Sequence, residues 1–120
     1  MDEIFFFDTY AFFEIINGNP AYEKYMNCDG ITTIFNIAEL NYNLKKSKDK
    51  KIADSYTDKF SKFIVEANVE DIKNAMDIKS QKRSLSIPDA IGYAISLKHK
   101  VKFLTGDNDF ENMSNVEFVK

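Results

Sequence analysis

The feature that most constrains the fold is an unbroken apolar run, Ile4–Phe7, near the start of the chain. Charged residues bound this run, with Glu3 before it and Asp8 after it. A strand with one face in water alternates apolar and polar residues, whereas a continuous run indicates a strand buried on both faces. Such a strand needs elements packed on each side of its sheet, so the run predicts a layered α/β architecture.

The rest of the sequence has the pattern of alternating helices and strands. Gly18 is a helix stop signal, Asn19 and Pro20 can start the next helix, and Asp49 and Ser86 can cap later ones. The expected helices cover residues 9–17, 20–28, 36–47, 50–63, 70–81 and 87–98, and the expected strands cover 4–7, 31–33, 64–69, 101–104 and 116–119. This order predicts a three-layer α/β/α sandwich with a mainly parallel five-stranded sheet, in a single domain of residues 1–120.

Composition narrows the functional classes. The one cysteine, Cys28, excludes an intrachain disulfide and a thiolate metal site, and it fits a reducing cytoplasm. The opening residues 1–3 have the wrong charge for a signal peptide, and the apolar runs are too short to span a bilayer, so no membrane association is expected. The net charge of −3 removes the simple argument for nucleic-acid binding, but it does not exclude a phosphate-bearing substrate when several acids share a metal site.

Four acidic residues occupy positions from which they can meet. Asp8 and Asp107 each follow an apolar strand, so both lie at the carboxyl edge of a parallel sheet, where ligands of α/β proteins bind. Glu39 lies on the helix after the second strand, and Asp89 lies in the first turn of a later helix. Each acid also has a purely structural explanation: a helix cap for Asp8, a capping box for Asp89, a turn for Asp107 and a solvated helix face for Glu39.

Together these acids point to metal-dependent chemistry. Three or four carboxylates crowded in one place cannot all stay ionised without cations. Oxygen-only ligands select Mg²⁺ or Mn²⁺ over zinc, and phosphodiester cleavage is the chemistry that uses such a cluster. The single histidine, His99, lies between two lysines at an expected helix end, where a solvated or helix-capping role is expected.

Four short motifs carry a family resemblance. Residues 5–9 form an apolar strand that ends in Asp-Thr, and residues 31–40 form a short strand and a helix ending in Ala-Glu-Leu. In residues 87–91 an aspartate opens a helix, and residues 103–110 are a strand followed by Thr-x-Asp-x-Asp-Phe. In this order and spacing, the motifs resemble those of the PIN-domain family, in particular its VapC-type toxins, over nearly the whole chain.

The resemblance implies a sheet of order 3-2-1-4-5 and an endoribonuclease that cleaves single-stranded RNA with Mg²⁺ or Mn²⁺. It implies an antitoxin protein as a partner and a homodimer as the assembly. The catalytic residues that it implies are Asp8, Glu39, Asp89 and Asp107, with Asp8, Asp89 and Asp107 as metal ligands and Thr9, Thr105 and Asp109 around them. Tyr10 stands where small residues are usual, and Gly92–Tyr93 replace a customary pair of alanines; both departures affect the expected fit of the substrate.

Basic and aromatic residues near the acids suggest a path for RNA. Lys45, Lys46 and Lys48 follow the Glu39 helix and are candidates for contacts to phosphates, with further basic groups at residues 82–83 and 98–102. Tyr10, Tyr42 and Tyr93 lie within a turn of an assigned acid and are candidates for stacking on bases. The alternative is that the lysines are solvated helix ends.

The sequence also leaves other interpretations open. With 11 Phe and 6 Tyr, a domain of this size is expected to expose an apolar groove for a protein partner, unless the aromatic residues all fill the core. A PIN nuclease of RNA processing and a non-catalytic α/β binding module are the alternative functions. A phosphoacceptor receiver is disfavoured because the acidic pair Asp2–Glu3 precedes the first strand, and a dehalogenase-like phosphatase because position 10 is tyrosine.

Overall fold

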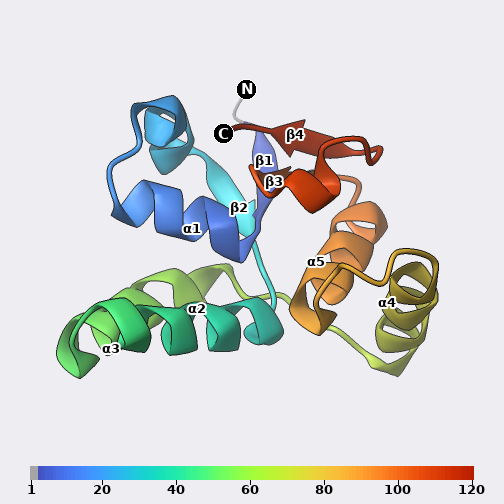
Figure 1. Ribbon diagram of the computed structural model, residues 1–120, viewed down its shortest axis with the longest axis horizontal. Helices are drawn as coiled ribbons and strands as arrows, with labels where there is room; N and C mark the ends of the chain where they lie inside the picture. The colour runs from blue at the N-terminus through green and yellow to red at the C-terminus, as the bar shows by residue number, and fades with distance from the viewer. Residues whose placement is uncertain (1–2) are drawn as a thin grey trace.

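A computed structural model describes residues 3–120, and in this part of the chain four strands form one parallel sheet (Figure 1). The strands are β1 (Ile4–Phe7), β2 (Asp29–Ile31), β3 (Lys102–Thr105) and β4 (Val116–Phe118). Their order is β2-β1-β3-β4, and every neighbouring pair is parallel. Because β1 has a neighbour on each side, its backbone is paired along both edges.

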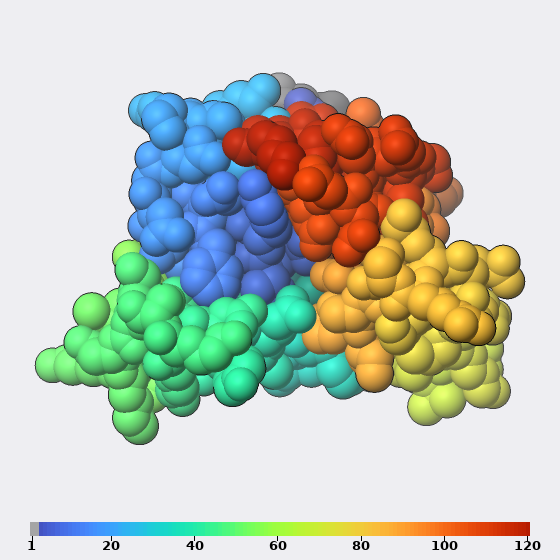
Figure 2. All heavy atoms as spheres, in the orientation of Figure 1, coloured from blue at the N-terminus to red at the C-terminus, as the bar shows by residue number. Residues whose placement is uncertain are grey.

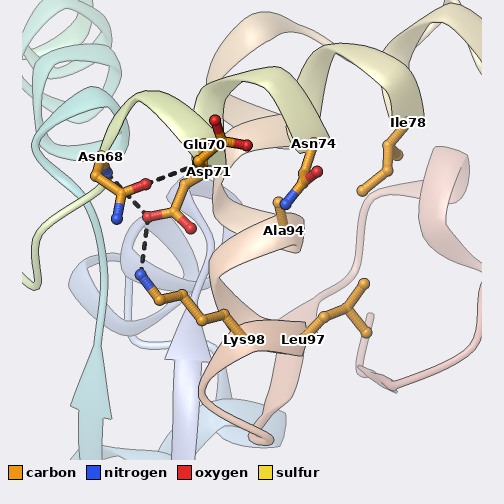
Figure 3. A pocket seen from close by; sticks show the side chains of 8 residues that line it. All are labelled: Asn68, Glu70, Asp71, Asn74, Ile78, Ala94, Leu97 and Lys98. Carbon is orange, nitrogen blue, oxygen red and sulfur yellow. Dashed lines mark hydrogen bonds and ion pairs between the residues drawn. The ribbon is translucent and has the colours of Figure 1, made fainter.

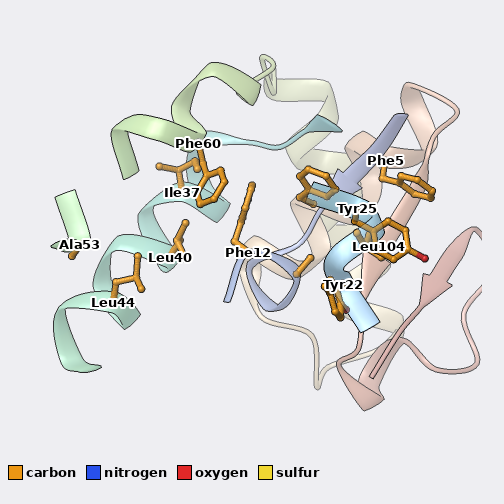
Figure 4. Packing of buried hydrophobic residues seen from close by; sticks show 12 residues of the cluster. Phe5, Phe12, Tyr22, Tyr25, Ile37, Leu40, Leu44, Ala53, Phe60 and Leu104 are labelled. Carbon is orange, nitrogen blue, oxygen red and sulfur yellow. The ribbon is translucent and has the colours of Figure 1, made fainter. Parts of the chain in front are cut away.

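Helices cover both faces of this sheet, so the fold has three layers. They are α1 (Thr9–Ile16), α2 (Ile34–Ser47), α3 (Lys50–Phe60), α4 (Val69–Gln81) and α5 (Ile87–Lys98), with 3₁₀ helices η1 (Pro20–Asn27), η2 (Ser61–Phe63) and η3 (Asn108–Phe110). On one face, Phe5 and Phe7 pack with buried residues of α1, η1, α2 and α3 (Figure 4). On the other face, Phe6 packs with buried residues of α4, α5 and η3.

The predicted strand over residues 64–69 is wrong, and so is the five-strand order 3-2-1-4-5. In its place Ile64 makes an isolated parallel bridge with Thr32, supported by hydrogen bonds from Thr32 N to Phe63 O (3.0 Å) and from Val65 N to Thr32 O (2.9 Å). Both segments then lead into helices, since Thr33 caps α2 and Asn68 caps α4 in a reciprocal capping box. The segment 20–27 also differs from expectation in being a 3₁₀ helix, although Asn19 caps it as predicted.

Close packing of α5 on β1 depends on Gly92. A Cβ atom at this position would lie 2.8 Å from the ring of Phe6, so only glycine lets the helix approach the strand this closely. This contact sets the depth at which α5 sits on the sheet.

In the described range 3–120, none of the helices combines the length and the apolar character that a membrane crossing requires.

Candidate active site

The carboxyl ends of β1, β2 and β3 meet at one edge of the sheet. Asp8 N donates to Leu104 O (3.3 Å), and Thr32 Oγ1 donates to Phe7 O (3.1 Å), so the three strand ends are directly joined. In the space-filling view, the segments that leave this edge meet on one face of the molecule: α1 in blue, the start of α2 in teal, α5 in orange and η3 in red (Figure 2). Each of these segments carries or adjoins one of the predicted acids.

Asp8 is buried at this edge with one unsatisfied oxygen. Its side chain is 2% exposed, and Oδ2 accepts a hydrogen bond from Thr105 Oγ1 at 2.8 Å. Oδ1 is buried and has no hydrogen-bond partner among the described residues. Asp8 occupies the N-cap position of α1, but its side chain makes no capping hydrogen bond. The helix-cap explanation therefore does not account for this carboxylate.

Asp89 combines a structural and an electrostatic role. Its Oδ2 accepts from Ser86 N (3.0 Å), while Asp89 N donates to Ser86 Oγ (3.1 Å), so the predicted capping box is present. The side chain is nevertheless only 9% exposed. Burial raises the pKa of Asp89 to about 6, helped by the charges of Glu39 and Asp107 and opposed by the Ser86 N–H.

The loop after β3 links the backbone of Asp107 to Asp8 through Thr105. Thr105 Oγ1, which donates to Asp8, also accepts from Asp107 N (3.1 Å). Asp107 Oδ1 then accepts from Asp109 N (2.9 Å), so the predicted turn is present as well. The loop is held tightly, since a Cβ atom at Gly106 would lie 2.2 Å from Val119 O. One threonine hydroxyl thus connects the two strand-end acids.

The pKa shifts connect the four predicted acids in pairs. Burial raises the pKa of Asp8 well above its ordinary value, and the charges of Asp89 and Glu39 raise it further against the hydrogen bond from Thr105. Glu39 and Asp107 in turn raise the pKa of Asp89. We refer to Asp8, Glu39, Asp89 and Asp107 as the acidic cluster. Its members destabilise one another as anions, so protons or cations are expected to stabilise it.

The donor set of the acidic cluster fits a hard divalent cation. All four side chains offer carboxylate oxygens, and Asp8 Oδ1 is a buried oxygen to which no described residue donates. Within residues 3–120, no three or more His, Cys, Asp or Glu side chains are grouped so that they could hold a metal ion. Oxygen ligands of this kind suit Mg²⁺ or Mn²⁺.

The raised pKa of Asp89 predicts a pH-dependent stability of the metal-free protein. A carboxyl with a raised folded-state pKa holds its proton more tightly in the folded protein than in the unfolded chain. Asp89 therefore stabilises the folded protein at low pH, and this stabilisation is lost as the pH rises from about 4 to about 6. We expect the free energy of unfolding of wild type relative to Asp89→Asn to fall by about 2 kcal/mol across this range. Urea unfolding in EDTA at several pH values measures this difference, and a pH-independent difference would contradict it.

The other predicted site residues lie at different distances from the acidic cluster. Thr9 Oγ1 donates to the backbone oxygen of Asn36 (3.4 Å) and not to an acid. Tyr10 is partly exposed. Burial and Glu14 raise its pKa most, and the charge of Asp107 raises it further, so Tyr10 lies near the acidic cluster. Tyr42 is 65% exposed on α2, with Lys46 Nζ 4.8 Å from its ring centroid.

Tyr93 is the predicted RNA-contact residue that the structure contradicts. Its side chain is buried, its hydroxyl donates to Ser114 O (2.7 Å), and its ring packs against Phe103 and Phe110. A ring enclosed in this way cannot stack on a base. Proximity in sequence to Asp89 suggested a role at the site, but on α5 this position faces the sheet.

The three predicted RNA-binding lysines lie at the far end of α2. Lys45 and Lys46 are in its last turn, and Lys48 follows it, at least six residues after Glu39 and so about 9 Å or more along the helix axis. Lys45 Nζ also pairs with Asp54 (3.1 Å). These lysines therefore form a basic end on the α2–α3 pair and do not line the acidic cluster.

One buried residue near the site was not among the predicted ones. Asn36 is completely buried, its Oδ1 accepts from Thr33 Oγ1 (2.5 Å) and its Nδ2 donates to Pro88 O (3.4 Å). The signal was present in the sequence, because Asn36 is four and eight residues before Leu40 and Leu44 and thus shares their core-facing stripe.

An apolar groove with a basic rim runs along α3, in agreement with the expectation of an exposed apolar surface. Two adjoining hollows share Lys59 and are lined by Lys51, Ile52, Ser55 and Tyr56 on one side and by Met26, Phe60, Lys62 and Phe63, among others, on the other. Met26 is 58% and Ile52 43% exposed. We refer to these residues as the α3 groove.

A further hollow of about 600 Å³ lies between α4 and α5 (Figure 3). Its charged groups are already paired, since Asp71 Oδ2 accepts from Asn68 N (2.9 Å) and from Lys98 Nζ (3.0 Å). None of the four acids lines it. This hollow is therefore separate from the acidic cluster.

Comparisons with known proteins agree with this fold. The family model of the PIN domain matches residues 5–116. A toxin–antitoxin complex from Klebsiella pneumoniae superimposes with a TM-score of 0.73 at 17% identity, covering 93% of this chain and 94% of the other. VapBC2 from Rickettsia felis, bound to a DNA fragment from its promoter, superimposes with a TM-score of 0.71 at 17% identity, covering 97% of both chains. None of the curated proteins matches the sequence.

Proposed function

Because the chain belongs to the PIN domain family, we propose that it is a metal-dependent endoribonuclease whose catalytic residues are the acidic cluster. The observation that carries this proposal is the buried Asp8 Oδ1, which has no hydrogen-bond partner among residues 3–120 and belongs to a carboxyl whose pKa is raised by burial and by the charges of Asp89 and Glu39. Such an arrangement is unfavourable for a purely structural carboxylate. It is favourable for a residue that holds a cation.

In this mechanism the chain's own residues assemble and orient the carboxylates. Asp8, Asp89 and Asp107 would hold Mg²⁺ or Mn²⁺, which supplies Lewis-acid stabilisation of the charge that develops on the scissile phosphate. The Thr105 hydroxyl holds Asp8 and the Asp107 backbone in fixed relation, and Asp109 supports the Asp107 side chain. Glu39, which is partly exposed, would accept a proton from the attacking water.

The direct test is cleavage of labelled single-stranded RNA with Mn²⁺, with Mg²⁺ and with EDTA. Cleavage that requires the divalent cation supports the nuclease. Metal-independent RNA binding without cleavage would instead support the non-catalytic binding module.

We also propose that the chain is the toxin of a toxin–antitoxin pair. Two structures of its fold are a toxin–antitoxin complex and a VapBC2 complex, and the α3 groove offers apolar side chains rimmed by lysines. An acidic, apolar segment of an antitoxin has the chemistry that fits this groove. The product of a neighbouring gene that co-purifies and inhibits cleavage supports the toxin, whereas its absence favours a nuclease of RNA processing. A homodimer is part of the proposal and is measured by sedimentation.

RNA binding is expected to depend steeply on salt despite the net charge of −3. Lysines that meet phosphates release counterions, so affinity falls as salt rises. The test plots the logarithm of the binding constant against the logarithm of the salt concentration. Changing Lys45, Lys46 and Lys48 to Gln in the Asp8→Asn background should lower the magnitude of the slope by about 2 to 3, roughly one for each lysine that no longer contacts a phosphate. Fluorescence anisotropy of labelled RNA at several salt concentrations measures the affinity of both proteins. An unchanged slope would remove the basic end of α2 from the RNA path.

A further inference from the structure

Asn36 is a polar side chain in an apolar position. It lies on α2 one turn before Glu39, and it is completely buried on the same stripe as Leu40 and Leu44. A buried amide costs free energy unless its donor and acceptor groups are satisfied. Apolar packing alone does not explain an amide at this position.

The hydrogen bonds of Asn36 reach two other acid-bearing segments. Its Nδ2 donates to Pro88 O (3.4 Å), directly before Asp89, and its backbone oxygen accepts from Thr9 Oγ1 (3.4 Å), directly after Asp8. Over residues 3–120, the bond to Pro88 is the only hydrogen bond that joins α2 to α5. Asn36 therefore lies where the segments of three cluster members meet.

The amide is held in one orientation. Oδ1 accepts from Thr33 Oγ1 (2.5 Å), which directs Nδ2 toward α5. A Cβ atom at Gly92 would lie 3.2 Å from Nδ2, so α5 packs against the amide with little free space. An ordered neutral amide can thus set the separation of two helices whose acids, Glu39 and Asp89, repel each other.

We propose that Asn36 is a positioning residue that fixes the separation of Asp8, Glu39 and Asp89 and thereby sets the affinity of the acidic cluster for divalent cations. The inference rests on the proposed function. Residues that orient metal ligands without touching the metal typically contribute 10- to 100-fold to metal affinity, so an effect of about this size is expected here.

The test compares Asn36→Leu and Asn36→Ala with a matched control, Asn41→Ala. Asn41 is on the same helix, and its Nδ2 bridges to Asp54 (3.0 Å) and Thr57 (2.8 Å) of α3, away from the acids. The readout is the Mn²⁺ concentration that gives half of the maximal rise in melting temperature, with the half-maximal Mn²⁺ concentration for RNA cleavage as a second measurement.

We expect the Mn²⁺ midpoint to rise about 10- to 100-fold in the two Asn36 variants. Asn41→Ala is expected to melt earlier in EDTA with an unchanged midpoint. Folded Asn36 variants with the wild-type midpoint would overturn the inference, and so would a failure of both to fold, because Asn36 would then be a stability residue. A wild-type protein that Mn²⁺ does not stabilise would refute the proposed metal site itself, which is a separate outcome.

Discussion

Replacing Asp8 with asparagine is expected to reduce metal-dependent RNA cleavage by roughly 10³-fold or more, which is about 4 kcal/mol of transition-state stabilisation. Asparagine keeps the shape of the side chain and can still accept the hydrogen bond from Thr105, but it removes the charge that would hold the cation. The loss should appear in the rate with saturating RNA as well as at low RNA concentration.

The same change is expected to stabilise the metal-free protein near pH 7. Burial and the charges of Asp89 and Glu39 raise the pKa of Asp8, so its ionised form opposes folding at neutral pH and its proton favours folding at low pH. The gain in Asp8→Asn should therefore shrink as the pH falls. Thermal melts in EDTA measure this gain in stability. Asp58→Asn, the same substitution on α3, is the matched control. Wild-type activity in Asp8→Asn protein would refute the assignment.

Replacing Gly106 with alanine is expected to destabilise the protein by about 3 kcal/mol, or roughly 10–15 °C in melting temperature. The added Cβ would lie 2.2 Å from Val119 O and 2.5 Å from the ring of Tyr10. The first of these neighbours is backbone, which cannot rotate away as a side chain can. Because Asp107 is the next residue, the displacement would also move one member of the acidic cluster.

Gly18→Ala is the matched control for this prediction. Gly18 has a positive φ of 76°, but a Cβ there would meet nothing within 4 Å. Its cost is the conformational strain alone, about 1 kcal/mol. Thermal unfolding of the two variants separates the steric from the conformational effect, and equal losses would show that the loop after β3 has more freedom than its packing indicates.

The parts of the fold that the sequence predicted are those governed by local rules. The run Ile4–Phe7 predicted a central strand because a doubly covered strand has no polar face, and Phe5 and Phe6 do enter cores on opposite faces. The rule for carboxyl edges placed Asp8 beside the loop that carries Asp107 because parallel strands end together.

The parts that could not be predicted depend on tertiary contacts. Whether residues 64–69 form a strand depends on how far they follow the edge of the sheet, and the bridge at Thr32 ends after one residue. The direction of the Tyr93 ring depends on the pocket formed by Phe103 and Phe110, far along the chain. The environment of Asn36 depends on the first turn of α5, which no pattern within α2 reveals.

The hydrogen bond between Asp8 and Thr105 spans 97 residues, and this separation affects how the protein is made. The strand β1 leaves the ribosome well before its neighbour β3 and the hydroxyl that holds Asp8. At ordinary elongation rates the interval lasts on the order of 5–20 s. The nascent chain therefore exposes an apolar strand without this partner throughout that time, and a long-range parallel pairing is also intrinsically slow to form. The topology thus delays the assembly of the acidic cluster until β3 and the loop after it have been translated.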